Sequence, residues 1–226
     1  MDKQIYKLGQ SIMKYDTPQP IMDKLNKIYD NKKKNKLKSA ASFLAGKIKN
    51  EYILYNDQPN APQEKRNHLD QELFDWFMQR FKDYVDTLGA WDIAIQLSSM
   101  WINDMKAGEY NPVHLHSSSR SLIGLSSVMI LKLPKKYGKE ISFPGLPTNG
   151  RLEFVGNAAG QFLRPNFTPK AVVGDFFIFP YDLQHTVYPF RNSKESRRTL
   201  SANVDTALLS ARHAWVAAWE GSKSAE

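Results

Sequence analysis

The first ninety residues carry apolar side chains at the spacing of amphipathic helices. One group follows Thr17-Pro18, a pair typical of a helix start, and comprises Ile21, Met22, Leu25, Ile28 and Tyr29. A second group repeats the spacing with Leu37, Ala41, Leu44 and Ile48. We therefore expect residues 1–90 to form an N-terminal helical support region that packs on the rest of the chain and is not an independent domain.

The strongest helix signal lies between Asn67 and Gly89. The apolar positions in this stretch are Leu69, Leu73, Phe74, Phe77, Met78, Phe81, Tyr84, Val85 and Leu88. Asn67 suits an N-terminal cap, and Gly89 suits a helix end. A stripe of aromatic side chains and methionine at this spacing indicates core packing rather than a cofactor site.

Beyond Gly89 the spacing of the apolar positions changes from helical to alternating. Residues 93–101 alternate with a period of two, which is typical of a β-strand. Further strands are predicted at residues 120–133, 150–156, 171–173, 176–179 and 197–204. Successive strands without helices between them indicate an antiparallel sandwich or barrel. We expect residues 91–226 to form this β core, with a C-terminal helical tail.

The composition is that of a globular protein, and it excludes several kinds of chemistry. Hydrophobic residues make up 42% of the 226 positions, and the sequence contains no cysteine. Disulfide scaffolds, thiolate zinc sites, iron–sulfur clusters and cysteine nucleophiles are therefore excluded, so imidazoles and carboxylates are the strong metal ligands that remain. No apolar run is long enough for a membrane span or for a signal-peptide core. We expect a soluble, cytoplasmic protein without a membrane partner.

The net charge of +8 is concentrated near the N-terminus. Residues 1–50 hold twelve lysines and four aspartates, and the densest run extends from Lys32 to Lys38. Such a run can contact phosphates, but it is more often a solvated surface. The run lacks the interleaved aromatic side chains that stack on bases, so a nucleic-acid partner is not expected.

Three histidines and one arginine carry the candidate chemistry. His114 and His116 flank a single residue, and on a strand such residues face the same side, so both can bind one ion. His185 joins them if the chain folds back through several strands. Arg197, in the segment RRTLSAN, offers a guanidinium fork that suits a carboxylate. The set predicts a redox metal that binds a small organic acid.

Four segments of the chain resemble the iron(II)- and 2-oxoglutarate-dependent dioxygenases. They are MWINDMKAGEYNPVHLH, RSLIGLSSVMILKLP, GDFFIFPYDLQHTVYPF and RRTLSANVD, and the resemblance covers about residues 91–205. It is strongest to the prolyl-hydroxylase-like group with an HxH pair, a later histidine and an arginine. It implies an α+β chain with a double-stranded β-helix (jelly-roll) core, and N-terminal helices packed along one outer face.

The resemblance also implies an activity and its cofactors. Members use Fe(II), the cosubstrate 2-oxoglutarate and dioxygen, and ascorbate is expected to stimulate them. 2-Oxoglutarate is decarboxylated to succinate and carbon dioxide while a C–H bond of the primary substrate is hydroxylated. A prolyl-type side chain in a peptide or protein is the substrate class that we rank first.

Matching the family motifs to this chain implies the metal ligands, with one departure. His114 and His185 occupy the two positions that are histidine throughout the superfamily. At His116 the wider superfamily has a carboxylate. Two interpretations are open: His116 completes a three-histidine ligand set, or it lies beside the metal while water fills its place. We favour direct ligation.

The resemblance assigns Arg197 and Thr199 to 2-oxoglutarate. The distal carboxylate of the cosubstrate needs a buried cation with two parallel donors. Arg197 and Thr199 share one face of the predicted strand, whereas Arg198 points away from it. Thr199 stands at the position of the hydroxyl group that accompanies the arginine in the family.

A second departure concerns Ile130, where related enzymes often place a tyrosine against the cosubstrate carboxylate. Asn103 and Ser126 are the residues that we expect to supply this hydrogen bond instead.

Two other functions fit parts of the pattern. One is a non-catalytic, cupin-like module in which three histidines hold zinc or nickel. The other is an oxygenase that modifies nucleic acids and uses the lysine run for binding. Arg197 argues against the first, because a closed structural site has no use for a cation aimed at a carboxylate. The second requires a base-flipping pocket or stacking aromatic residues near the lysines, and the sequence shows neither.

Overall fold

The computed structural model describes residues 4–7, 9–42, 44–58, 66–89, 92–137, 148–156, 165–191 and 193–208. The helices in this part of the chain are α1 (Gln19–Asp30) and α2 (Gln71–Thr87). The strands are β1 (Gln4–Lys7), β2 (Ser11–Asp16), β3 (Glu51–Asn56), β4 (Arg66–Asn67), β5 (Ile93–Met105), β6 (Asn111–His114), β7 (Gly124–Lys132), β8 (Leu152–Val155), β9 (Asn166–Phe167), β10 (Asp175–Pro180), β11 (Gln184–Val187) and β12 (Arg197–Leu208). Neither helix is both long and apolar enough to span a membrane.

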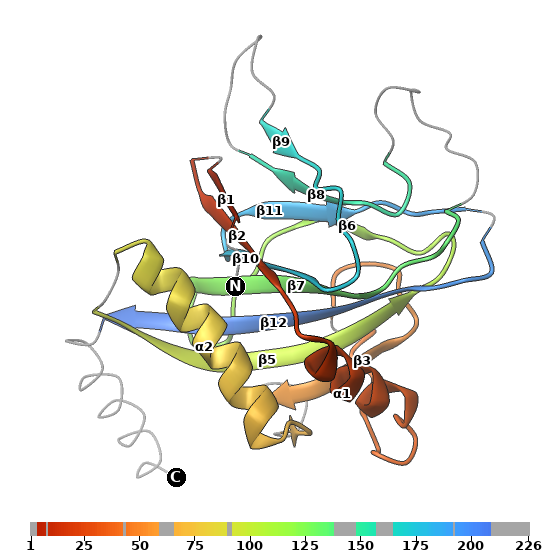
Figure 1. Ribbon diagram of the computed structural model, residues 1–226, viewed down its shortest axis with the longest axis horizontal. Helices are drawn as coiled ribbons and strands as arrows, with labels where there is room; N and C mark the ends of the chain where they lie inside the picture. Colours follow the sequence, from red (N-terminus) through yellow and green to blue (C-terminus); the bar gives the residue numbers. More distant parts are fainter. Residues whose placement is uncertain are drawn as a thin grey trace.

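The strands form two antiparallel sheets. The larger sheet has the order β1-β2-β10-β7-β12-β5-β3-β4, and the smaller one has the order β6-β11-β8-β9. Figure 1 shows the smaller sheet over one face of the larger sheet, and the two helices against the opposite face. This arrangement confirms the expected α+β architecture with a double-stranded β-helix core.

Strand alternation divides the buried residues between the two faces of the larger sheet. On β7, Val128 and Ile130 point into the space between the sheets, where they meet Phe154 of the smaller sheet. Met129 and Leu131, which alternate with them, point toward the helices. Because successive side chains of a strand face opposite sides, the nearly continuous buried run of β7 contributes to both hydrophobic cores.

Helix α2 confirms the strongest helix signal of the sequence. Its N-terminal cap is Asp70 rather than Asn67: the Asp70 carboxylate accepts a hydrogen bond of 2.8 Å from the backbone N–H of Leu73. Such a cap satisfies one of the N–H groups that a helix start leaves without a partner.

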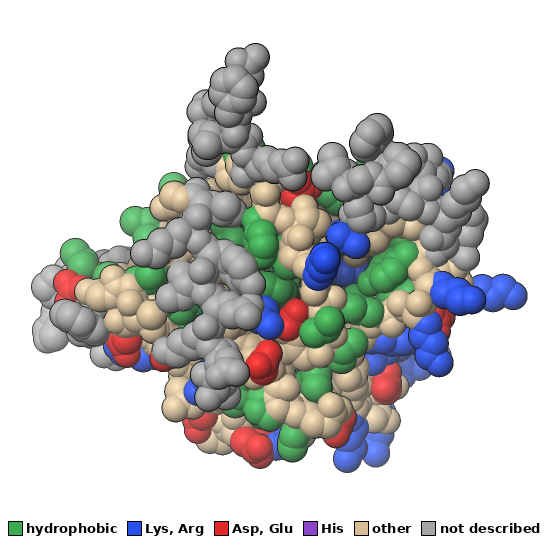
Figure 2. All heavy atoms as spheres, turned by 45° about the horizontal axis from the view of Figure 1, so that its top comes forward, with side chains coloured by type: hydrophobic (Ala, Val, Ile, Leu, Met, Phe, Trp, Pro, Cys, Tyr) green, Lys and Arg blue, Asp and Glu red, His purple; other side chains and the backbone are tan. Residues whose placement is uncertain are grey.

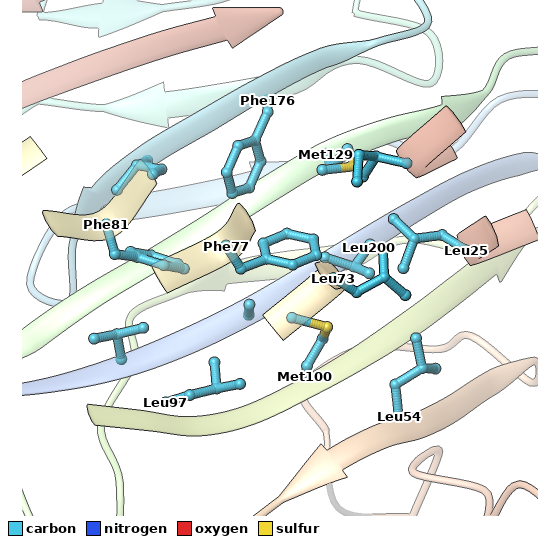
Figure 3. Packing of buried hydrophobic residues seen from close by; sticks show 14 of the residues in the cluster. Leu25, Leu54, Leu73, Phe77, Phe81, Leu97, Met100, Met129, Phe176 and Leu200 are labelled. Atoms are coloured by element: carbon cyan, nitrogen blue, oxygen red, sulfur yellow. The ribbon is translucent and has the colours of Figure 1, made fainter. Parts of the chain in front are cut away.

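The apolar face of α2 packs on the outer face of the larger sheet. Figure 3 shows Phe77 and Phe81 of the helix pointing toward Phe176 on β10. The ring centroid of Phe176 lies 5.5 Å from that of Phe77 and 6.2 Å from that of Phe81, in edge-to-face geometry. The expectation of core packing for this aromatic stripe is therefore confirmed.

The N-terminal region is not only a helical layer, which corrects the expectation for residues 1–90. Strand β2 pairs with β10, and β3 pairs with β5, so the region also extends the larger sheet on both sides of its centre. The expected C-terminal helical tail lies in residues 209–226, outside the described residues.

The helix predicted over residues 37–48 is wrong. The first and last of its four apolar residues are buried, as the pattern required, but the backbone forms turns. Ala40 N–H donates to the backbone carbonyl of Glu51, which ties the segment to β3. Gly46 has a φ of +127°, and a Cβ there would lie 2.9 Å from the carbonyl oxygen of Tyr110. The segment therefore packs closely against the chain just before β6 and does not form a helix.

Most predicted strands are present with shifted ends. β5 continues to Met105, β12 continues to Leu208, and β7 begins at Gly124. The strand predicted at residues 171–173 is absent from the described structure. In its place the chain makes a turn, in which the Asp175 carboxylate accepts from the backbone N–H of Val172.

We propose that the N-terminal region is inseparable from the core, and we expect a chain that begins at Gly89 not to fold. It would lose β2, β3 and α2, and with α2 the fully buried rings of Phe77 and Phe81. Burial of each such ring contributes about 1.5–3 kcal/mol. Circular dichroism and size-exclusion chromatography would test this, and a folded, monomeric truncated chain would contradict it.

Candidate metal centre and adjoining cavities

Three histidines converge at the edge of the smaller sheet. His114 is the last residue of β6 and stands directly opposite His185 on β11. His116 lies two residues beyond the end of β6. One ligand atom from each ring lies within 4.8 Å of the others, so the three side chains form a group that can hold a metal ion.

Hydrogen bonds to backbone carbonyls fix the tautomers of two of the rings. His114 Nδ1 lies 2.7 Å from the carbonyl oxygen of Pro112, and His185 Nδ1 lies 3.1 Å from that of Leu183. A carbonyl only accepts, so each Nδ1 carries the proton and each Nε2 presents a lone pair. Carbonyl partners of this kind commonly orient metal-binding histidines.

The electrostatic surroundings keep the imidazoles neutral. Burial lowers the pKa of His185 to about 3, and the neighbouring His114 adds to the effect. Burial also lowers the pKa of His116, well below its ordinary value, and that of His114. Metal ions bind the neutral ring, so at neutral pH the three side chains are in the ligating form.

The spacing of the nitrogens suits a single metal ion. His116 Nε2 and His185 Nε2 are 3.2 Å apart. Two ligands of one ion, bound at about 2.1 Å and at angles between octahedral and tetrahedral, are about 3.0–3.4 Å apart. The residues present therefore fit a first-row metal held on one side by three imidazoles.

The position of His116 has a different cause from the one that the HxH spacing suggested. The strand ends at His114, so strand alternation does not orient His116. Instead, the backbone N–H of His116 donates to the carbonyl of Tyr181 at 2.9 Å. The Tyr181 hydroxyl in turn donates to the buried carboxylate of Asp205 at 3.0 Å. The loop that follows β6 is thus bound to the C-terminal part of β12.

Asp205 also binds two other residues of the loop that follows β6. Its carboxylate accepts from Ser118 Oγ at 2.9 Å and from Arg120 Nε at 3.1 Å. Arg120 additionally donates to the backbone carbonyl of Asp57. A buried carboxylate with three donors is well compensated, so this network connects the segment after His116 to β12.

A cavity of about 470 Å³ opens beside the three histidines. Its walls come from both sheets and from two loops; they include Glu51, Ile53, Trp101, Asn103, His114, His116, Val128, His185, Val187, Thr199, Ser201 and Asn203, with Ala40, Leu44 and Ala45 from the turn segment before β3. The volume lies in the range of small-molecule sites. Among the described residues, the metal group therefore adjoins space for ligands.

Arg197 lies on the same strand as part of this wall but lines a different cavity. Thr199, two residues later on β12, lines the histidine cavity. Arg197 is 3% exposed and lines a second cavity of about 430 Å³, together with Tyr137 and Arg151. Residues two apart on a strand share a face, so the structure brings Arg197 next to the histidine cavity but not into its wall.

The guanidinium of Arg197 is buried without a compensating acid. Within the described residues no carboxylate forms an ion pair with it, and burial lowers its pKa to about 10. It therefore stays charged at neutral pH. A buried cation without a counterion is unfavourable, which makes this position suited to an anionic group.

Arg198 points to the opposite face of the sheet. Its guanidinium lies 3.0 Å from the Asp30 carboxylate, donates to Asn26 Oδ1 at 2.7 Å and stacks over the ring of Tyr29 at 4.1 Å. All three partners belong to α1. Arg198 thus fastens the helix to the sheet.

Asn103 and Ser126 occupy different places. Asn103, on β5 opposite Thr199, lines the histidine cavity, and no donor from the described residues reaches its buried Oδ1. Ser126 is fully buried on β7 opposite Asn203 and does not line that cavity. Ile130 is buried opposite Thr199 in the space between the sheets.

Sequence reasoning missed one acidic residue of the cavity, Glu51. It lies at the start of β3, in a region that was expected to be helical. The signal that could have found it is the alternation of Glu51, Ile53 and Tyr55, which suits a strand.

Comparison with known proteins gives a family match and likenesses of fold. The family described as "Putative 2OG-Fe(II) oxygenase" matches residues 99–203. This stretch contains the three histidines and Arg197. No curated protein matches the chain by sequence.

Three solved structures illustrate the likeness of fold. A prolyl-4-hydroxylase from Pseudomonas putida has a TM-score of 0.53 at 13% identity, covering 85% of this chain and 91% of that one. A viral collagen prolyl hydroxylase from Paramecium bursaria Chlorella virus 1, in complex with 2OG, has a TM-score of 0.51 at 12% identity, with coverages of 87% and 96%. A prolyl hydroxylase from Trichoplax adhaerens, in complex with a hypoxia-inducible-factor peptide, has a TM-score of 0.53 at 10% identity, with coverages of 85% and 82%.

Proposed function

On the premise that residues 99–203 carry the sequence pattern of the 2OG-Fe(II) oxygenases, we propose that this protein is an Fe(II)- and 2-oxoglutarate-dependent dioxygenase. It couples the oxidative decarboxylation of 2-oxoglutarate to the hydroxylation of a second substrate. One observation carries the proposal: three neutral imidazoles converge beside an open cavity.

The three histidines are the proposed iron ligands. His114 and His185 present Nε2 lone pairs, and His116 joins them as a direct ligand, since its Nε2 faces that of His185. Bound iron supplies the activation of dioxygen in this chemistry. The protein contributes the fixed geometry and, through the low pKa values of the rings, ligands that need not lose a proton first.

Arg197 and Thr199 are the proposed partners of the distal carboxylate of 2-oxoglutarate. Arg197 is a buried cation that lacks an acidic partner from the described residues, and Thr199 shares its strand face. No donor from the described residues reaches the Oδ1 of Asn103, and an amide oxygen only accepts, so Asn103 would contribute through its amide N–H groups. Ser126, which lies outside the cavity wall, is the weaker candidate for this hydrogen bond.

A peptide substrate of the prolyl type remains our first-ranked class. It is supported by the likeness of fold to prolyl hydroxylases, one of which was solved with a peptide bound. Fold likeness alone does not define a substrate, so the residues that line the cavity must account for the choice of substrate.

The two alternative functions find less support. A structural metal site is closed by its protein ligands, so a cavity beside the three histidines is not expected for it. For nucleic acids, Figure 2 shows Lys and Arg side chains gathered on one side of the molecule. The lysine run begins just after α1, and within the described residues neither lysine nor arginine lines the histidine cavity.

Formation of succinate tests the proposal. The full chain, supplied with Fe(II), ascorbate and 2-oxoglutarate in air, is expected to release succinate slowly by itself and faster with a substrate peptide. Replacement of Fe(II) by Zn(II) is the control and should abolish the product. If succinate formation with iron stays at the level of the zinc control over a panel of peptides, the chain is not an oxygenase of this type.

A further inference from the structure

Glu51 is a buried acidic residue in the wall of the histidine cavity. Its side chain is 2% exposed, and it stands opposite Asn103 on β5, which itself stands opposite Thr199 on β12. Among the described lining residues, it is the one acidic or basic side chain apart from the histidines. Glu51 is therefore the one carboxyl group that the described residues place in the wall of this cavity.

The carboxyl group of Glu51 has no compensating partner within the described part of the chain. None of the described residues donates a hydrogen bond to this side chain or forms an ion pair with it, which is unfavourable for a buried carboxylate. Burial raises its pKa to about 7, and the neighbouring carboxylate of Glu109 adds to the rise. A charged donor brought next to it would reverse this penalty and restore the ionised form.

Two other polar atoms near the cavity are acceptors that no donor of the described residues reaches. The amide oxygens of Asn103 and Asn203 are buried, and no donor from the described residues reaches them. Both side chains are at least nine-tenths buried, and both residues line the cavity. A ligand group with several N–H donors and a positive charge would satisfy these oxygens and Glu51 together.

2-Oxoglutarate is not that ligand, because both of its ends are carboxylates. An anion is repelled by Glu51 and attracted by Arg197, which lines the other cavity. Arg197 would thus attract the anionic cosubstrate toward Thr199, and Glu51, which lines the same cavity as Thr199, would attract a cationic second substrate.

We infer that Glu51 recognises a positively charged group of the second substrate, an ammonium or a guanidinium, which enters the cavity beside the histidines. The inference rests on the proposed function for the role of that ligand, and it narrows the substrate class to basic peptides or amines. A prolyl residue within a peptide has no N–H group and carries no charge. A peptide of the proposed type would therefore bring a lysyl or arginyl side chain, or a free amino group, into the cavity.

Binding of small charged probes tests Glu51 without turnover. Calorimetry on the full chain at pH 8 would compare Nα-acetyl-lysine amide and Nα-acetyl-arginine amide with the uncharged Nα-acetyl-norleucine amide and Nα-acetyl-proline amide. Each titration would be run with and without Fe(II) and 2-oxoglutarate, in the absence of oxygen. We expect at least one basic probe to bind about tenfold or more tightly than the uncharged probes.

Matched variants assign that preference to one carboxylate. Glu51→Gln should remove the preference, and Glu51→Asp should retain part of it because the charge is kept. Glu153→Gln is the control: Glu153 is also buried, but its carboxylate is held by Asn166 and Tyr188, outside this cavity. Equal binding of lysine and norleucine probes, or an unchanged preference in Glu51→Gln, would overturn the inference.

The outcomes separate this inference from the proposed function. A charge preference that depends on Glu51 in a protein that forms no succinate would support the inference and contradict the oxygenase assignment. Succinate formation stimulated equally by basic and uncharged peptides, in the parent and in Glu51→Gln, would support the oxygenase and contradict the inference.

Discussion

Replacement of His185 by alanine is expected to abolish tight metal binding and, with it, succinate formation. The ligand atoms of three histidines lie within 4.8 Å of one another, and His185 Nε2 is 3.2 Å from that of His116. Loss of a group that only orients a metal ligand commonly costs about 10–100-fold in metal affinity, so loss of a ligand itself should exceed about 100-fold. Anaerobic titration with Fe(II), or with Co(II) as a spectroscopic probe, measures the change.

Two further histidine variants make this result specific. His68→Ala removes a partly buried imidazole that is not in the three-histidine group, and it should leave metal affinity unchanged. His116→Asp introduces the carboxylate that is the commoner ligand of the superfamily at this position, and it should retain metal binding. If His185→Ala binds the metal as tightly as the parent protein, the three histidines are not the metal site.

Replacement of Arg197, even by lysine, is expected to weaken 2-oxoglutarate binding by about 30-fold or more. A guanidinium presents two parallel donors to a carboxylate, which an ammonium does not reproduce. Loss of a buried, charge-assisted contact costs about 2–5 kcal/mol, and about 2 kcal/mol already corresponds to this factor. Titration of 2-oxoglutarate into the anaerobic iron complex, followed by its metal-to-ligand charge-transfer band, gives the dissociation constant.

The adjacent Arg198 provides the control. Arg198→Ala removes contacts to Asp30, Asn26 and Tyr29 of α1, so it should lower the melting temperature. Because these contacts lie on the outer face of the sheet, 2-oxoglutarate affinity should stay within a factor of about two. A larger loss of affinity in Arg198→Ala than in Arg197→Lys would contradict the assignment of the cosubstrate site.

Local sequence pattern predicted the parts of the fold that depend on one element at a time. The long helix α2 and the central strands β5, β7 and β12 follow from periodicity, because burial on one or both faces imposes it. The opposite orientations of Arg197 and Arg198 also follow from alternation along one strand. Each of these features is set within a single run of residues.

Features that depend on distant partners could not be read in this way. The segment 37–48 has a helical spacing of apolar residues, but its backbone bonds to β3 and to the chain before β6. His116 is placed by Tyr181 and Asp205, which are far from it in sequence. Glu51 becomes a cavity residue only because β3 pairs with β5. In all three cases tertiary contacts outweigh local propensity.

The order of strands in the larger sheet has a consequence for how the chain folds. β12 is the last described strand in sequence, yet it lies between β7 and β5 near the centre of the sheet. During synthesis, β5 and β7 therefore emerge with open edges that remain unpaired until residues 197–208 leave the ribosome. Pairings between strands so distant in sequence form slowly, and exposed edges favour association with other chains. Nascent chains that stall before Arg197 would thus be especially prone to aggregate.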